Sequence, residues 1–247
     1  MKSPRAGMDV KNKLVVALDV TPARAKEIVS RTRDLAGIYK VGPVLWLEWG
    51  SECLKFFAGE GARVMIDFKF HDIPNTVKAS LAALLRAPGS ESIWGVTLHT
   101  LGGYAMLTTA VSERDAAAHR PMLFGVTVLT SLREKDLYRV GINRTVEAEV
   151  KKLAVLAEDA GLDGVVCSGD ETAVIRKACG REFLTLVPGV RLDANPKKDL
   201  DQKRVVTPAA ALAGGADYLI VGRDIYEAED PRERLEALLG AAATAER

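Results

Sequence analysis

The chain has 247 residues, of which 48% are hydrophobic and 27% are charged, with 34 lysines and arginines against 33 aspartates and glutamates. These proportions are typical of globular proteins and exclude collagen-like and intrinsically disordered classes. A net charge of +1 gives no reason to expect a nucleic-acid tether, so a charged ligand must be bound by a local cluster of side chains.

Cysteine usage and the first residues bear on the cellular setting. Cys53, Cys167 and Cys179 show no Cys-x-x-Cys spacing and are odd in number, which argues against a disulfide framework or a zinc site. The N-terminal residues lack the apolar core of a signal peptide, and no apolar run approaches the roughly 20 residues of a membrane span. We therefore expect a cytoplasmic protein that binds neither membranes nor nucleic acids.

Short apolar segments alternate with longer amphipathic ones along the whole chain. The apolar segments predict strands, which in chain order are 14–20, 38–42, 63–70, 93–100, 122–129, 164–169, 183–190 and 217–222. The segments between them have helical spacing; within 146–160, for example, apolar residues recur on one face. Threonine or aspartate before proline predicts helix starts at Thr21, Thr207 and Asp230, and glycines predict helix ends at 161, 180 and 214–215.

Strands that are apolar on both faces, each followed by a helix, indicate a buried parallel sheet. Eight such units in roughly 230 residues favour a closed (β/α)8 TIM barrel. We expect one domain spanning 1–247, in which about residues 1–13 form an N-terminal extension. An open doubly wound sheet is the alternative, because periodicity does not report closure. In a barrel, the active site lies at the C-terminal ends of the strands.

Charged residues stand at the predicted C-terminal ends of the first three strands. Asp19 ends the first, Lys40 lies near the end of the second, and the third runs through Asp67 and Lys69. Because alternate residues of a strand share a face, Asp67 and Lys69 are expected to point together into the barrel mouth. Unpaired buried charges cost several kcal/mol each, so we expect these four groups to pair in an alternating array. A salt bridge that only closes the barrel is the alternative.

The residues after Lys69 allow other interpretations. Asp72 precedes Ile73 and Pro74 and is expected to cap the next helix, which does not exclude a catalytic role. His71 is expected to pack or to support the site. Asp67 and Asp72 could hold magnesium, but the Lys69 ammonium group would repel the cation, so we expect no metal.

A second cluster follows the seventh and eighth strands, where barrels of this kind commonly bind phosphate. The seventh strand leads through Pro188 into Arg191 and a long polar loop at 192–205 that is expected to act as a lid. The eighth ends in Gly222, which permits close backbone approach, and Arg223, which can bind phosphate bidentately. The alternative for Arg223 is an ordinary surface arginine.

The segment 67–76, D-F-K-F-H-D-I-P-N-T, resembles the hallmark of the orotidine 5′-phosphate decarboxylase family. Other segments resemble the family in the same order, so that the resemblance covers roughly residues 14 to 235: 18–19, 39–42, 128–131, 187–191, 201–204 and 221–223. Departures are few. Phe68 stands where the family often has leucine, and Thr100 stands where a small residue is common; both differences concern local packing.

The resemblance implies decarboxylation of orotidine 5′-phosphate to UMP, the last step of UMP synthesis, without metal or organic cofactor. It implies that Lys69 protonates C6 of the pyrimidine, that Asp67 lies beside the departing carboxylate, and that Asp72 completes the charged array. It also implies a homodimer in which Asp72, Ile73 and Thr76 reach into the partner's barrel. The implied substrate contacts are Asp19 and Lys40 to the ribose, Thr130 to the base, Pro188 in the pocket, and Arg191, Gln202, Gly222 and Arg223 to the phosphate and lid.

Two rival functions stay open. Sister enzymes on the same barrel, such as 3-keto-L-gulonate 6-phosphate decarboxylase and hexulose-phosphate synthase, share an Asp-x-Lys-x-x-Asp strand and need magnesium. They are not expected to combine segments 73–76 and 201–204 as they stand here. A nucleotide-binding barrel that has lost the chemistry is the other rival, and the presence of Asp67, Lys69 and Asp72 argues against it.

Overall fold

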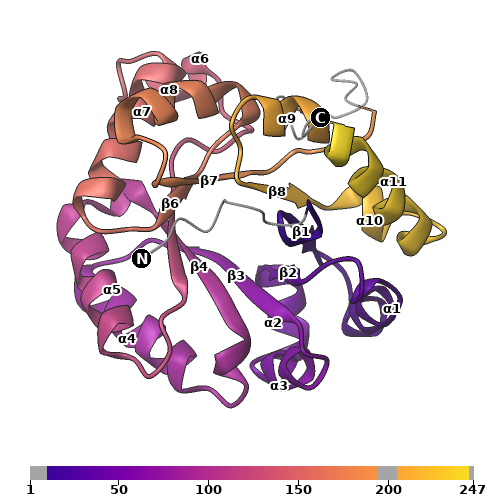
Figure 1. The fold of residues 1–247 in the computed structure, drawn as a ribbon. Helices are drawn as coiled ribbons and strands as arrows, with labels where there is room; N and C mark the ends of the chain where they lie inside the picture. Colours follow the sequence, from indigo (N-terminus) through magenta and orange to yellow (C-terminus); the bar gives the residue numbers. More distant parts are fainter. Residues whose placement is uncertain (1–9, 194–204, 245–247) are drawn as a thin grey trace.

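The computed structural model describes residues 10–193 and 205–244, and its strands form one closed parallel barrel in sequence order (Figure 1). The closed barrel confirms the predicted (β/α)8 fold and excludes the open sheet. The strands are β1 Leu14–Ala17, β2 Ile38–Val41, β3 Arg63–Phe70, β4 Ile93–His99, β5 Met122–Val126, β6 Gly164–Val166, β7 Leu184–Val187 and β8 Tyr218–Val221.

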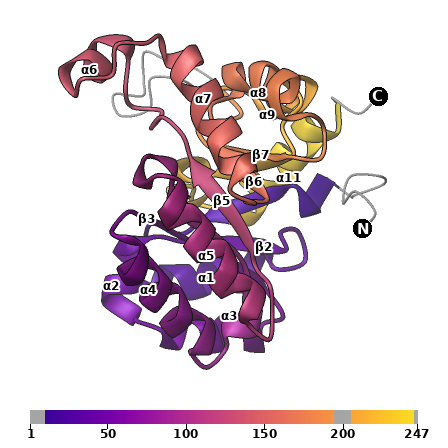
Figure 2. The ribbon, with the colours of Figure 1, turned by 90° about the vertical axis from the view of Figure 1, so that its left-hand side faces the viewer.

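Helices surround the barrel on the outside (Figure 1). They are α1 Pro22–Thr32, α2 Pro43–Trp49, α3 Glu52–Gly59, α4 Pro74–Arg86, α5 Tyr104–Ala116, α6 Glu134–Arg139, α7 Val146–Asp159, α8 Thr172–Cys179, α9 Pro208–Ala213, α10 Arg223–Tyr226 and α11 Pro231–Ala243. Short 3-10 turns are η1 Val10–Asn12, η2 Ser90–Ser92, η3 Thr100–Gly102 and η4 Gly169–Glu171. Figure 2 shows α4 and α5 side by side on the outside of the barrel and α6 projecting at one end of the molecule. No helix in the described part of the chain is long and apolar enough to cross a membrane.

The predicted helix caps are present. The Thr21 and Thr207 hydroxyls accept hydrogen bonds from the backbone N–H groups of Arg24 and Ala210, and the Asp230 carboxylate accepts one from the N–H of Arg232. The glycines predicted to end helices adopt positive φ at 161, 180 and 215, a conformation that costs glycine little. Local sequence therefore fixes where α1, α9 and α11 begin.

Strand lengths differ from the prediction at their C-terminal ends. The apolar segment 122–129 gives a strand only to Val126, although Val128 beyond it is still buried. Apolar residues continue past the last ladder hydrogen bond because they form the wall of the barrel mouth. Hydrophobicity alone therefore cannot mark the end of such a strand.

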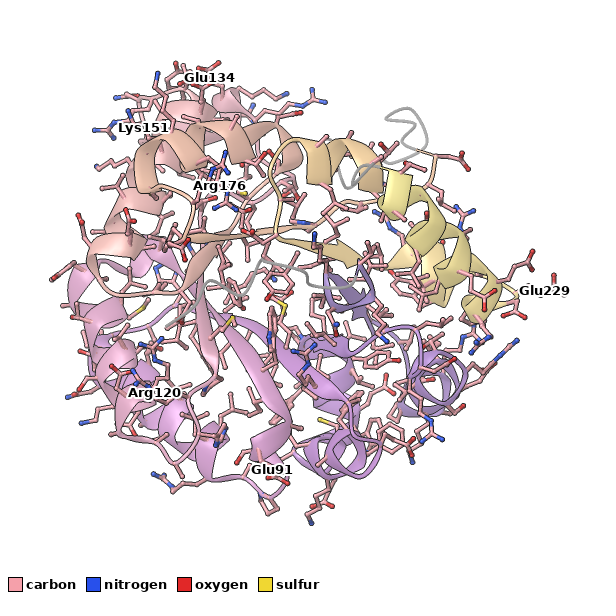
Figure 3. All side chains as sticks on the ribbon, in the orientation of Figure 1. Glu91, Arg120, Glu134, Lys151, Arg176 and Glu229 are labelled. Carbon is pink, nitrogen blue, oxygen red and sulfur yellow. The ribbon has the colours of Figure 1, made fainter. Side chains whose placement is uncertain are left out.

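The interior of the barrel is filled by side chains rather than open. A cluster of buried residues, in which Trp94 packs against Phe124 and Tyr218 at ring-centroid distances of 5.3 and 4.8 Å, occupies the centre. A larger apolar layer lies between the strands and the helices. Arg176 joins α8 to β7 and β8 through Thr185 and Asp217, whereas Glu134 and Lys151 lie on the outside of the helix ring (Figure 3). A ligand therefore cannot enter the filled centre of the barrel.

Candidate active site

A cavity of about 310 Å³ opens where the strands end at their C-terminal side. Its apolar floor includes Ala17 and Ile220, which belong to the central barrel cluster. The residues that the sequence predicts for the site and that line this cavity are Asp19, Lys40, Asp67, Lys69, Thr130, Pro188, Arg191, Gly222 and Arg223. One cavity thus brings together side chains from both ends of the sequence. Gln202 lies outside the described residues.

The predicted array of alternating charges is present at the C-terminal ends of β1 to β3. Lys40 Nζ lies 3.1 Å from Asp19 Oδ1 and 3.3 Å from Asp67 Oδ2. Lys69 Nζ lies 2.9 Å from Asp67 Oδ1. Asp67 and Lys40 are almost fully buried, whereas the Lys69 side chain is 37% exposed toward the cavity. The central pair is therefore fixed by its surroundings, and the outer ammonium group faces the ligand space.

Burial and charge act in opposite directions on the two buried groups of this array. Burial alone would raise the pKa of Asp67, but the charges of Lys40 and Lys69 and hydrogen bonds from Lys69 and Thr97 outweigh it and hold this pKa below its usual range. Burial would likewise lower the pKa of Lys40, but Asp67 and Asp19 raise it above its usual value. Both groups are charged at neutral pH, so the array keeps its alternation.

The backbone at Lys69 is unusual. Among residues 10–193 and 205–244, Lys69 alone of the non-glycine residues has a positive φ, of 49°. The pairing of β3 with β4 shifts at this point: Ile66 pairs with Val96 and Phe70 with Leu98, so a bulge of three residues faces one. A left-handed conformation at a non-glycine residue costs about 1–3 kcal/mol and is often found where function requires it. Lys69 reaches Asp67 through this bulge rather than through the regular alternation that the sequence predicts.

Asp72, Ile73 and Thr76 lie apart from the cavity of their own chain. All three are exposed, and none lines the cavity. The prediction that Asp72 caps α4 is wrong by one residue: Ile73 occupies the N-cap position, and the Asp72 carboxylate accepts a hydrogen bond from the Ile73 N–H at 2.7 Å. The proline that follows Ile73 sets the first helical position one residue later than expected. The Asp72 carboxylate therefore contacts the N-cap residue and accepts no hydrogen bond from the first turn of α4.

The histidines near β3 and β4 pack on each other rather than on the cavity. The His71 and His99 rings stack with their centroids 5.1 Å apart. Burial, together with the nearby His71 and Lys69, lowers the pKa of His99. This stack agrees with the expectation that His71 packs or supports the site. Within the described ranges, no group of three metal-ligating side chains is close enough to hold a metal ion.

Comparison with known proteins assigns this arrangement to a family. The model of the orotidine 5′-phosphate decarboxylase / HUMPS family matches residues 12–238. The chain belongs to this family. An orotidine 5′-phosphate decarboxylase from Moorella thermoacetica is 46% identical over 231 residues, which cover 91% of this chain and 89% of the relative. One from Syntrophotalea carbinolica is 43% identical over 230 residues, with 91% and 92% covered.

A solved structure agrees with the sequence relatives. The crystal structure of orotidine 5′-phosphate decarboxylase from Lactobacillus acidophilus matches with a TM-score of 0.78 at 32% identity, covering 94% of this chain and 99% of that chain. All three relatives are named orotidine 5′-phosphate decarboxylase, which is the first of the two names in the family description. The chain is thus an enzyme of the orotidine 5′-phosphate decarboxylase family, with the charged array at the carboxyl ends of its barrel strands.

Sequence reasoning missed three residues that shape this family member's site. Thr97 hydrogen-bonds to both Asp67 and Lys69. Gly42 leaves room for the array, because a Cβ at this position would lie 2.9 Å from Asp19 Oδ1. Tyr226 lines the cavity from α10. Only Gly42 lies in a segment of family resemblance; no spacing rule points to Thr97 or Tyr226.

Proposed function

We propose that this chain decarboxylates orotidine 5′-phosphate to UMP without a metal or an organic cofactor, and that Lys69 protonates C6 of the pyrimidine. The observation that carries the proposal is the Asp67–Lys69 pair in the same cavity as Arg191 and Arg223. One end of the cavity offers a fixed ammonium group, and the other offers guanidinium groups suited to a phosphate dianion. A phosphorylated nucleotide with a reacting carboxylate matches both ends.

The chemistry follows from the charges. When the C6–carboxylate bond breaks, carbon dioxide leaves and the electron pair stays on C6, where no electron sink is available to spread it. The Lys69 ammonium group stabilises this charge from a fixed position and then transfers a proton to C6, which yields UMP and a neutral amine that solvent reprotonates. Asp67 keeps Lys69 in place at 2.9 Å. Asp19 and Lys40 bind the ribose hydroxyls beside it.

We propose that the active site is completed by a second copy of the chain. The exposure of Asp72, Ile73 and Thr76 outside their own cavity supports this assignment. Ile73 is 67% exposed, and Leu101 and Tyr104, which follow the neighbouring strand β4, are about half exposed. An apolar surface beside Asp72 suits burial against a partner. In the homodimer, Asp72 would lie beside the array of the partner.

We also propose a cytoplasmic location. Cys53, Cys167 and Cys179 are all buried. Burial raises the pKa of Cys53 to about 12, and it also raises the pKa of Cys179 to about 12, with Glu158 adding to the effect. Reduced thiols of this kind suit a reducing compartment.

The rival within the same family is a magnesium-dependent sugar-phosphate enzyme, and a substrate comparison separates the two. The purified protein is incubated either with orotidine 5′-phosphate and a chelator, or with a β-keto sugar-phosphate acid and magnesium, and products are separated by chromatography. UMP formation with the chelator present, and no turnover of the sugar phosphate, is the expected result. Turnover of the sugar phosphate alone would transfer the assignment to the rival.

Replacing Arg223 with alanine should weaken phosphate binding. Charged hydrogen bonds of this type contribute about 1.5–3 kcal/mol each, so we expect kcat/KM for orotidine 5′-phosphate to fall roughly a hundredfold. Steady-state kinetics measure the effect. Arg232→Ala is the matched control, because Arg232 pairs with Asp34 at 2.8 Å on the outer surface. Equal kinetics in the Arg223 variant and the control would refute the role of Arg223 in phosphate binding.

A further inference from the structure

Thr97 is the residue of β4 that faces the bulge in β3. Its side chain is fully buried, and its hydroxyl makes two hydrogen bonds across the two strands. The oxygen accepts the backbone N–H of Lys69 at 2.9 Å, and the hydroxyl donates to Asp67 Oδ1 at 3.0 Å. A hydroxyl has one proton and two lone pairs, so both roles are filled at once. One side chain therefore joins the two ends of the bulge.

Asp67 Oδ1 is also the atom that receives the Lys69 ammonium group, at 2.9 Å. The contact from Thr97 limits how this carboxylate can rotate, and the rotation of the carboxylate decides where Nζ is held. The hydrogen bond from the Lys69 N–H to Thr97 acts on the backbone of Lys69, where φ is 49°. Thr97 thus acts on both the backbone and the tip of Lys69 without reaching the cavity itself.

We propose that Thr97 is a positioning residue for the decarboxylation: it holds the Lys69 backbone in its left-handed conformation and fixes the Asp67 oxygen that aims the ammonium group. This inference rests on the proposed function, in which Lys69 delivers the proton to C6. It assigns to β4 a part in the charged array, which otherwise comes from β1, β2 and β3. A side chain that keeps a reacting group in the orientation needed for reaction affects the rate of the chemical step rather than substrate binding.

The test compares Thr97→Val with wild type, since valine keeps the shape and removes both hydrogen bonds. A reacting group displaced by about 1 Å can cost a hundredfold in rate, so we expect kcat to fall roughly a hundredfold. KM should stay nearly unchanged, because the ribose and phosphate contacts are untouched. Thr97→Ser, which keeps the hydroxyl, should restore most of kcat. A purely structural role would lower stability in both variants without this split between kcat and KM.

Thr127→Val is the matched control. Thr127 is also fully buried at the end of a strand, but its hydroxyl donates to the backbone carbonyl of Val166 at 3.0 Å and does not touch the array. We expect this variant to keep the wild-type kcat. Thr97→Cys, with a weak donor of similar size, gives a second variant in case valine prevents folding, and its kcat should lie between those of valine and serine.

A crystal structure of the Thr97→Val variant gives a result that does not depend on activity. The expected structure has Lys69 outside the left-handed region or its Nζ away from Asp67. Unchanged geometry of Lys69, or a wild-type kcat in the valine variant, would overturn the inference. A wild-type protein that does not consume orotidine 5′-phosphate would instead refute the proposed function, and the crystal structure would still decide what Thr97 holds.

Discussion

Replacing Lys69 with alanine is expected to abolish turnover of orotidine 5′-phosphate while UMP still binds. In the proposed mechanism, the substitution removes both the cation that stabilises charge on C6 and the proton that C6 receives. Loss of one fixed electrostatic group costs about a hundred- to a thousandfold, and loss of an acid costs a similar factor, so kcat should fall by more than about a thousandfold. Ultraviolet absorbance measures turnover, and calorimetry measures UMP binding.

Binding should survive because the proposed phosphate and ribose contacts come from other elements. Lys40 Nζ lies 3.3 Å from Asp67 Oδ2, so the buried carboxylate is expected to keep one cation beside it in the variant. Lys55→Ala is the matched control, since Lys55 pairs with Glu52 at 2.8 Å on the exposed face of α3. Turnover near the wild-type rate in the Lys69 variant would refute its role as proton donor. Loss of UMP binding would show that Lys69 acts in binding as well.

Replacing Asp72 with alanine should also abolish turnover, and a mixture with the Lys69→Ala variant should restore part of it. If Asp72 serves the partner's cavity, a mixed dimer has one site with both residues intact and one site with neither. In a two-fold symmetric dimer mixed at random, this arrangement gives about a quarter of the wild-type activity. The measurement is turnover after the two variants are mixed and allowed to exchange subunits.

The mixing experiment discriminates because a site built within one chain gives the opposite outcome. Were Asp72 to serve its own chain, every subunit in the mixture would carry one defect, and no activity would return. Size-exclusion chromatography of each variant shows that dimers still form. Glu91→Ala, an exposed acidic residue on η2 with no contact to the cavity, is the control for a surface carboxylate and should leave activity unchanged.

Much of the fold and the array could be predicted because both follow from short-range rules. Apolar runs that alternate with helical spacing predicted every strand of the barrel. Asp19, Lys40 and Asp67 could be placed together because parallel strands bring their carboxyl ends to one rim. Closure of the sheet is different, since it depends on how the strands tilt and stagger around the whole ring, and the sequence left the open sheet as an alternative.

The remaining site features depend on contacts between distant residues. Regular alternation places Asp67 and Lys69 on one face, and the two side chains do meet, but through a bulge stabilised by Thr97 from another strand. No local pattern reports that partner. The cap of α4 was predicted one residue early because Asp72 is a strong capping residue by type, whereas the proline at the first helical position decides the start.

The most direct test of the account is the absorbance decay of orotidine 5′-phosphate when the purified wild-type protein is added in the presence of a chelator. The account predicts complete conversion to UMP at a rate that the chelator does not change, because the ammonium group of Lys69 supplies the charge and the proton. A protein that binds UMP but leaves orotidine 5′-phosphate unchanged would contradict it.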